Sequence, residues 1–207
     1  MIKKLPLIEL KINPEDESFV SAISLVEAPA VESQFIAFSQ DKDVHQFNLN
    51  DEKRELIGIA MKANVPIYRK DAKFGEYAVV FSADTIRQIA QTFFQKNFSK
   101  SLNIEHSSID AESFVFQSYI VDFDKGMLAP KGIDDAGNGD WIVGVKVLSN
   151  SVWSDIKSGK QKGFSVEGIF SSLDLEKEID FQFQNKEHDL LTELEALLDA
   201  FILANNL

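Results

Sequence analysis

The chain has 207 residues, of which 44% are hydrophobic and 26% are charged, and this suits one globular domain with a core of its own. It contains no cysteine, which excludes disulfides, thiol catalysis and thiolate metal sites. The formal net charge of −12 argues against sequence-independent binding to nucleic acid, because such binding needs a cationic surface.

The N-terminal part of the chain predicts short strands. Residues 5–12 alternate apolar and polar side chains, residues 19–26 form an apolar run that ends before Pro29, and residues 35–38 predict a third strand. Glu9 and Lys11 interrupt the apolar residues that follow the basic start. We therefore expect neither a signal peptide nor a membrane-spanning segment.

A charged and polar stretch, residues 39–54, predicts a linker, after which the pattern changes. Residues 56–61 are continuously apolar, which is typical of a strand buried on both faces. Residues 65–68 predict an edge strand or a bend, and residues 77–81 predict another strand. Residues 83–94 then keep their apolar side chains on one helical stripe, and Ser82 is the predicted N-cap.

The remaining elements follow in the same way. Apolar residues lead into His106, residues 113–123 and 141–147 predict strands, and residues 152–157 predict a short helix closed by Gly159. Residues 163–170 predict a strand, and residues 186–205 a helix with a wide leucine stripe. We expect an α+β fold, a mostly antiparallel, barrel-like sheet with a few helices, followed by a C-terminal amphipathic helix.

Two residues stand out for their chemistry, His106 at the predicted end of one strand and Ser165 on another. Brought together, they would supply a general base and a nucleophile. Each also has an ordinary structural interpretation. His106 would be a half-buried histidine with its hydrogen bonds satisfied, and Ser165 a small residue, flanked by Gly163 and Gly168, where strands pack closely.

A third catalytic member is less clearly indicated. Glu167 follows Ser165 by two residues, so it shares a strand face at roughly 6–7 Å between Cα atoms. It would either orient His106 or be an ordinary solvated carboxylate. Glu27 and Asp122 are weaker candidates, and Glu105 is expected to point away from His106 on a regular strand.

Other site chemistry is weakly indicated. The oxyanion of an acyl-transfer reaction would be bound by backbone N–H groups or by a nearby cation, for which Lys160 and Lys162 are candidates. Glu105, His106 and Asp110 have metal-ligand chemistry but no second histidine at metal spacing, and the turn at residues 132–140 lacks the register of a calcium loop. No glycine pattern for nucleotides is present, and we expect neither a metal nor a cofactor.

Three local patterns, read in order, carry a resemblance to a known family. Residues 81–84 open a helix, His106 ends a strand, and residues 157–160 lead through a glycine into residues 163–165. This order resembles the tailed-phage prohead (capsid maturation) serine proteases, which are related in fold to the herpesvirus assemblins. Residues 163–168, together with residues 117–122, look most like the XkdF-type phage serine proteases, and the likeness covers about residues 55–172.

The N-terminus departs from that pattern. Residues 22–30 resemble a strand that prohead proteases carry after the nucleophile strand, whereas here it precedes the first hairpin. This suggests a circular permutation in which the strand still completes the same sheet. The family's candidate acidic residue on that strand corresponds to Ala22, so its role does not carry over to this chain.

The resemblance implies a domain plan and a function. Residues 1–38 would complete the protease sheet, residues 39–54 would link it to a protease core over 55–185, and residues 186–207 would form a C-terminal, scaffold-like helix. The implied activity is a serine endopeptidase with Ser165 as nucleophile and His106 as general base, for which Glu167 is the candidate third member from its strand spacing alone. It would process phage scaffold and major capsid proteins inside the assembling prohead, in the host cytoplasm.

The implied partners are therefore proteins, with no nucleic acid or membrane, and the C-terminal helix is a possible site of self-association. The alternative is a non-catalytic head-assembly or scaffold-associated protein on the same fold.

Overall fold

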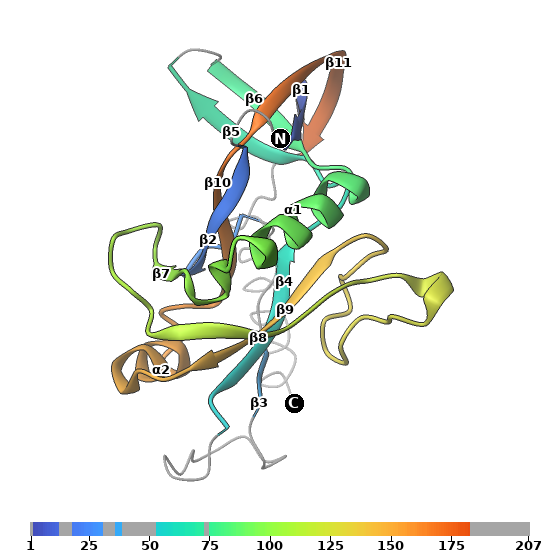
Figure 1. Ribbon diagram of the computed structural model, residues 1–207. Coiled ribbons are helices and arrows are strands. Elements are labelled where there is room, and N and C mark those ends of the chain that lie inside the picture. The colour runs from blue at the N-terminus through green and yellow to red at the C-terminus, as the bar shows by residue number, and fades with distance from the viewer. Residues whose placement is uncertain (1, 13–17, 31–35, 39–52, 73–74, 183–207) are drawn as a thin grey trace, which may run out of the picture.

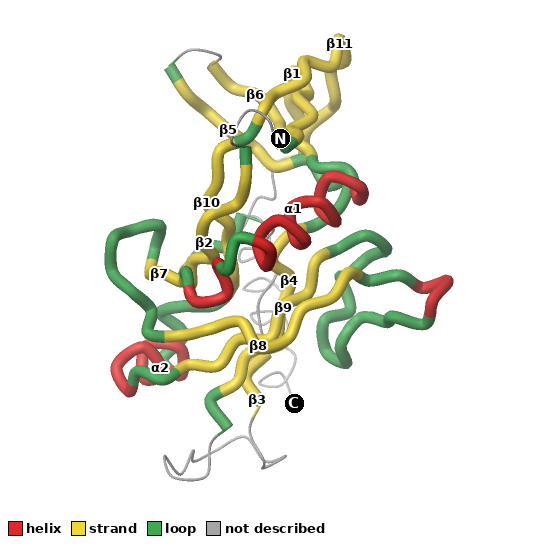
Figure 2. Tube along the Cα trace, in the orientation of Figure 1, coloured by secondary structure: helices red, strands yellow, loops and turns green. Residues whose placement is uncertain are grey.

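The computed structural model describes residues 2–12, 18–30, 36–38, 53–72 and 75–182. Most of the predicted linker and the whole predicted C-terminal helix lie outside these ranges. Within them the fold is mixed α+β and mostly strands, as Figure 2 shows, with the two α-helices α1 and α2. None of the described helices is long and apolar enough to span a membrane.

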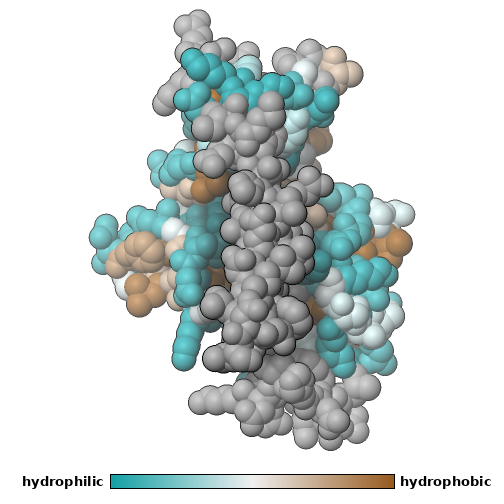
Figure 3. Space-filling view, turned by 180° about the vertical axis from the view of Figure 1, so that it is seen from behind, coloured by the Kyte–Doolittle hydropathy of each residue, from teal (hydrophilic) through white to brown (hydrophobic). Residues whose placement is uncertain are grey.

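The strands form three separate sheets (Figure 1). The first has the order β11-β1-β6-β5, and its strands are β1 (Ile2–Lys11), β5 (Ile67–Asp71), β6 (Gly75–Val80) and β11 (Ser171–Gln182). The described strands do not close into a barrel, so the expectation of a barrel-like sheet is wrong in that respect. Seen from behind, the described part of this first sheet presents a largely hydrophilic surface (Figure 3).

The second sheet positions the candidate site. It has the order β10-β2-β7, formed by β2 (Phe19–Val26), β7 (Leu102–Ile104) and β10 (Gly163–Ile169). The central strand β2 runs antiparallel to β10 and parallel to β7. The N-terminal strand β2 therefore joins the two segments that carry His106 and Ser165, which are far from it in the sequence.

The third sheet has the order β3-β4-β9-β8 and supplies much of the core. Its strands are β3 (Ile36–Phe38), β4 (Glu55–Met61), β8 (Ser113–Ile120) and β9 (Trp141–Val147). Six of the seven residues of β4 and six of the seven of β9 are buried, as their continuous apolar sequence predicts.

Helix α1 (Ala83–Gln95) packs its apolar stripe between the second and third sheets (Figure 1). Ser82 is its N-cap and accepts a hydrogen bond from the backbone N–H of Thr85, as predicted. The ring of Phe93 on this helix lies edge-on against Trp141 of β9, with ring centroids 5.5 Å apart. The helix thereby joins the sheet that carries the site to the core.

The shorter elements complete the description. Helix α2 (Asn150–Lys157) begins two residues before its predicted start, and its N-cap is Ser149. In the described part of the chain, 3₁₀ turns lie at Phe98–Lys100 and Phe123–Lys125. Helix α2 buries Val152, Trp153 and Ile156, and five residues, 158–162, connect it to β10.

Candidate active site

Strand register places three polar residues side by side across the second sheet. Ser24 on β2 lies directly opposite Ser165 on β10, and on its other side it is paired with Asn103 of β7. Residues opposite each other in neighbouring strands project from the same face of a sheet. The other face of the sheet carries Ile23, Leu25 and Phe164, which are buried in the core, so the polar residues face away from it.

His106 joins this polar face from a tight turn and not from a strand. Strand β7 ends at Ile104, and both Glu105 and His106 have left-handed backbone conformations, with φ of 50° and 52°. The turn is held by a hydrogen bond from the backbone N–H of Ser107 to the carbonyl of Ile104. Two consecutive non-glycine residues in this conformation are uncommon and often accompany functional sites.

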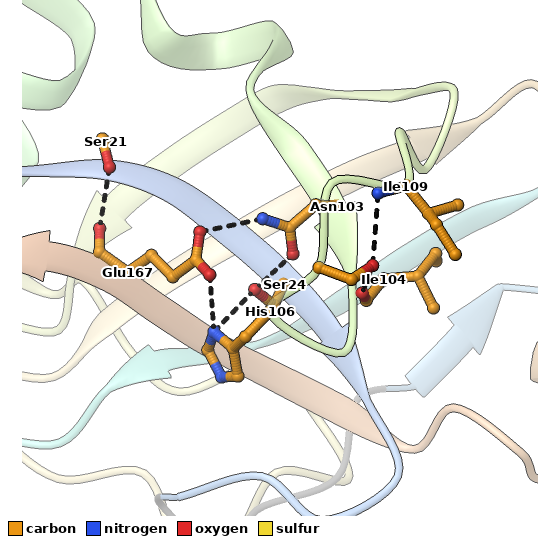
Figure 4. Close-up of polar contacts among 8 residues, drawn as sticks. Ser21, Ser24, Asn103, Ile104, His106, Ile109 and Glu167 are labelled. Carbon is orange, nitrogen blue, oxygen red and sulfur yellow. Dashed lines mark hydrogen bonds and ion pairs between the residues drawn. The ribbon is translucent and has the colours of Figure 1, made fainter.

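A connected network of polar contacts surrounds one side of the imidazole (Figure 4). His106 Nδ1 lies 3.0 Å from Ser24 Oγ and 3.3 Å from Glu167 Oε1. Ser24 Oγ donates to Asn103 Oδ1 at 2.6 Å, and Asn103 Nδ2 donates to Glu167 Oε2 at 2.9 Å. Both oxygens of the carboxylate are thus engaged, one by the histidine and one by the asparagine.

The network fixes where the protons lie once Glu167 is ionised, because a carboxylate only accepts hydrogen bonds. The Asn103 amide must then turn its NH₂ toward Glu167, which leaves its oxygen to accept the proton of Ser24. The Ser24 hydroxyl has one proton, which it donates to Asn103, so its oxygen accepts a hydrogen bond from Nδ1–H of His106. A neutral His106 therefore carries its proton on Nδ1 and its free lone pair on Nε2.

The backbone around Glu167 is adapted to this position. A bulge interrupts the pairing of β10 with β2 between Glu167 and Gly168. A Cβ atom at Gly168 would lie 2.5 Å from the carbonyl oxygen of Phe19, so only glycine allows the strands to come this close. Ser21, at the bulge, donates from Oγ to the carbonyl oxygen of Glu167 at 3.4 Å.

Ser165 is close to the network but is not hydrogen-bonded to His106 within the described part of the chain. The direct contact expected from the sequence is therefore not formed, and Ser24 occupies the position nearest to Nδ1. Ser165 is 8% exposed and forms part of the wall of a pocket of about 120 Å³. Its cross-strand pairing with Ser24 places the Cβ atoms of the two serines roughly 4.5–5.5 Å apart.

The other candidate acids lie elsewhere. Glu105 accepts a hydrogen bond from the backbone N–H of Glu27 at 2.7 Å, and the Glu27 carboxylate lies 3.6 Å from Lys162 Nζ. Asp122 interacts with Lys125 and Arg87, and the hydrogen bond from Lys125 holds the pKa of Asp122 below its ordinary value. Of the carboxylates considered from the sequence, the structure brings Glu167 to His106.

The two lysines considered for the oxyanion each pair with a carboxylate. Lys160 Nζ lies 3.0 Å from Asp155 Oδ2, and Lys162 has the contact with Glu27 described above. Neither contact joins a lysine to the polar face of the second sheet. No group of three or more histidine, aspartate or glutamate side chains among the described residues is placed to hold a metal ion.

Sequence reasoning missed Ser24 and Asn103. Each does leave a signal, because each is a polar residue between two apolar ones in a strand, Ser24 between Ile23 and Leu25 and Asn103 between Leu102 and Ile104. What the sequence does not reveal is that β2 lies between β7 and β10, which brings the two residues to His106 and Glu167.

Comparisons with known proteins give one result. Searches of curated proteins and of solved structures gave no match. A family model described as "Putative phage serine protease XkdF" matches residues 43–174, more than half of the chain, and these residues contain His106, Ser165 and Glu167. The chain therefore belongs to the XkdF family of phage proteins, whose name denotes a serine protease.

Proposed function

We propose that this protein is a serine endopeptidase in which Ser165 is the nucleophile, His106 the general base and Glu167 the residue that orients the base. The observation that carries the proposal is the network on Nδ1 of His106, which in the neutral ring leaves the lone pair on Nε2, free to accept a proton. The His106 side chain is 40% exposed, so this nitrogen is accessible to an incoming substrate. The family name supports the same class of reaction.

The reaction is an acyl transfer in two halves. Ser165 Oγ attacks the peptide carbonyl carbon while Nε2 of His106 takes the hydroxyl proton, and the same proton then goes to the leaving amine as the C–N bond breaks. Water, deprotonated by His106, next attacks the acyl-serine ester and releases the new carboxyl terminus. Glu167 stabilises the imidazolium that forms in each half, because its carboxylate lies 3.3 Å from Nδ1.

The hydrogen bond between Ser165 and His106 forms, in this proposal, when substrate binds. Catalytic hydrogen bonds are often long in unliganded enzymes and shorten in the complex with substrate. His106 lies in a turn and not in a paired strand, so rotation of its side chain does not break the sheet. Ser165 lies directly opposite Ser24, whose Oγ contacts Nδ1 of the ring, so Ser165 and the imidazole lie on the same face of the second sheet.

Ser24 is a positioning residue and not the nucleophile. Its hydroxyl proton is directed at Asn103 Oδ1, 2.6 Å away, and its oxygen accepts from Nδ1–H. In this arrangement no basic nitrogen faces the Ser24 hydroxyl proton. Ser24 is also fully buried, which keeps a peptide carbonyl from reaching it.

The substrates we propose are the scaffold protein and the major capsid protein of a tailed phage, cleaved inside the prohead in the host cytoplasm. The family's phage origin supports this choice. The acidic leucine-striped segment at residues 186–205 would add self-association or contact with scaffold.

Co-expression with the scaffold protein of the same phage tests the proposal. Ser165→Ala and His106→Ala are each expected to abolish scaffold cleavage while the protein keeps its thermal unfolding temperature. Ser154→Ala, at an exposed position on α2, is the matched control and should cleave as the parent does. Cleavage that continues in Ser165→Ala would refute the assignment, and a parent that never cleaves would favour a non-catalytic assembly protein.

A further inference from the structure

A pocket of about 120 Å³ opens next to Ser165, where β10 faces β4, β5 and β6. Ser165 and Val166 form its wall on the β10 side, and Ala60, Ile67 and Val79 are among the residues that line it from the other strands. Among the described strands β10 pairs only with β2, so its outer edge is the side that faces this space. The pocket therefore lies along the edge of the strand that carries the proposed nucleophile.

Most residues that line the pocket are apolar, and several of them belong to packed strands. Ala60, Met61, Val79 and Phe81 line it and are each less than 5% exposed, and all four lie in or directly after strands of the two neighbouring sheets. The ring of Phe81 packs edge-on against that of Phe170, another lining residue, with centroids 5.0 Å apart. Side chains packed in this way do not readily rearrange.

The size of the pocket suits one medium-sized side chain. A cavity of about 150 Å³ lined by apolar residues holds a benzene molecule. The pocket here is slightly smaller, at about 120 Å³, and has room for a leucine or methionine side chain but not for an indole.

Two cations also line the pocket, and they argue against a basic ligand. Lys62 Nζ lies 2.6 Å from Asp135 Oδ2, so its charge is paired within the protein. Arg69, at an exposed position on β5, donates to the carbonyl oxygen of Tyr68 at 3.0 Å and has no acidic partner among the described residues. Its positive charge at the pocket would repel a lysine or arginine side chain.

We propose that this pocket binds a medium-sized apolar side chain, leucine or methionine, of the substrate residue whose carbonyl Ser165 attacks. The proposal rests on the proposed function, because it uses Ser165 as the nucleophile. Ser165 forms part of the pocket wall, so a side chain in the pocket has its own carbonyl within reach of the hydroxyl. The remainder of the substrate would extend along the outer edge of β10 as an added strand.

Diphenyl α-aminophosphonates test the pocket without knowledge of the cleavage sequence. These probes carry one amino-acid side chain beside the phosphorus. The serine oxygen forms a bond to phosphorus, phenoxide leaves, and the serine proton passes through His106 to the phenoxide. The second-order rate constants are measured by intact mass for probes with Ala, Leu, Phe, Glu and Lys side chains. One methylene in an apolar pocket changes such rates roughly 10- to 200-fold.

We expect the Leu probe to react at least ~10-fold faster than the Ala and Lys probes. Ile67→Ala enlarges the pocket at a half-buried position on the edge strand β5 and should shift the preference from Leu toward Phe. Arg69→Ala should raise the rate of the Lys probe. Lys70→Ala removes a cation from the opposite face of the same strand and is the matched control, which should change neither preference.

A simple alkyl fluorophosphonate without an amino-acid side chain separates the two claims. Suppose that the alkyl fluorophosphonate labels Ser165. The pocket proposal is then wrong, while the protease proposal stands, if the Lys or Glu probe reacts faster than the Leu probe, or if Ile67→Ala does not change the order of the probe rates. If neither it nor any aminophosphonate labels Ser165, the protease proposal itself fails.

Discussion

The role of Glu167 leads to a prediction about the single substitution Glu167→Gln. One oxygen of the parent carboxylate accepts a hydrogen bond from Asn103 Nδ2 at 2.9 Å, and the other lies 3.3 Å from His106 Nδ1, within ion-pair distance. A glutamine offers one oxygen and one NH₂ group, so one of these two donors must face another donor. The substitution therefore removes a charged acceptor and breaks the chain of hydrogen bonds that fixes the imidazole tautomer.

The expected loss follows from the strength of the contact. A hydrogen bond to a charged group contributes about 1.5–3 kcal/mol, and each ~1.4 kcal/mol of lost transition-state stabilisation costs tenfold in rate. We therefore expect Glu167→Gln to slow the reaction of Ser165 with an alkyl fluorophosphonate by roughly 10- to 150-fold. The thermal unfolding temperature should change little, because the Glu167 side chain is one-third exposed.

Glu105→Gln is the matched control for this measurement. Glu105 precedes His106 directly, but its carboxylate accepts from the backbone N–H of Glu27, and a glutamine oxygen can do the same. Its labelling rate should stay within about threefold of the parent rate, well below the loss of one charged hydrogen bond. If Glu167→Gln reacts at the parent rate, or if Glu105→Gln is the slower variant, Glu167 does not orient the base.

Three further predictions concern stability. Gly168→Ala should lower the free energy of unfolding by about 1–3 kcal/mol, because the added Cβ would lie 2.5 Å from the carbonyl oxygen of Phe19. Gly137→Ala is the control and should not lower it, because the nearest atom to its added Cβ is 3.9 Å away. Equal unfolding temperatures for the two variants would contradict this prediction. Gln161→Met should raise the free energy of unfolding by about 1 kcal/mol or more, because both side-chain polar atoms of the buried Gln161 lack a hydrogen-bonding partner among the described residues. Urea unfolding measures this change, and a loss of stability would show that these atoms do have a partner. Burial raises the pKa of Asp140, so the native state holds this proton more tightly than the unfolded state does. The stability of the parent relative to Asp140→Asn should therefore fall as pH rises from the ordinary aspartate pKa through the raised one. Urea unfolding of both proteins at several pH values measures this difference, and a difference that stays flat or rises with pH would contradict the prediction.

Local sequence patterns predicted much of the fold. The bounds of β2 and β9 coincide with the predicted residues 19–26 and 141–147, and α1 extends the predicted helix by one residue. These segments have strong periodicity or continuous apolar character, and α1 also has a capping serine. Where the local pattern is strong, the sequence alone is sufficient.

Strand β11 shows where this reasoning stops. Residues 171–182 alternate leucine, isoleucine and phenylalanine with charged residues, which is a strand pattern, but its many charges obscured it. In the structure it pairs along its length with β1, antiparallel, and the paired residues lie between 160 positions apart (Lys11 and Ser171) and 180 positions apart (Ile2 and Gln182) in the sequence. Pairing over such a separation is not encoded in any local window.

The sequence pointed to several residues of the candidate site but not to the contacts between them. His106, Ser165 and Glu167 were identified from their residue types and order, and the structure brings His106 and Glu167 together. The left-handed turn at Glu105 and His106 was not foreseen, because both are ordinary residues that usually avoid this conformation. The insertion of Ser24 into the network depends on sheet order, which the sequence does not show.

Mapping the site of covalent labelling tests the central claim most directly. The protein is treated with an alkyl fluorophosphonate, digested with trypsin and analysed by tandem mass spectrometry. Trypsin cleaves after Lys162 and Lys177, so the peptide that contains Ser165 does not contain Ser24. We expect the adduct on Ser165, with labelling lost in His106→Ala and slowed, but still on Ser165, in Ser24→Ala. An adduct on Ser24, or equal labelling of Ser165 in His106→Ala, would contradict the account.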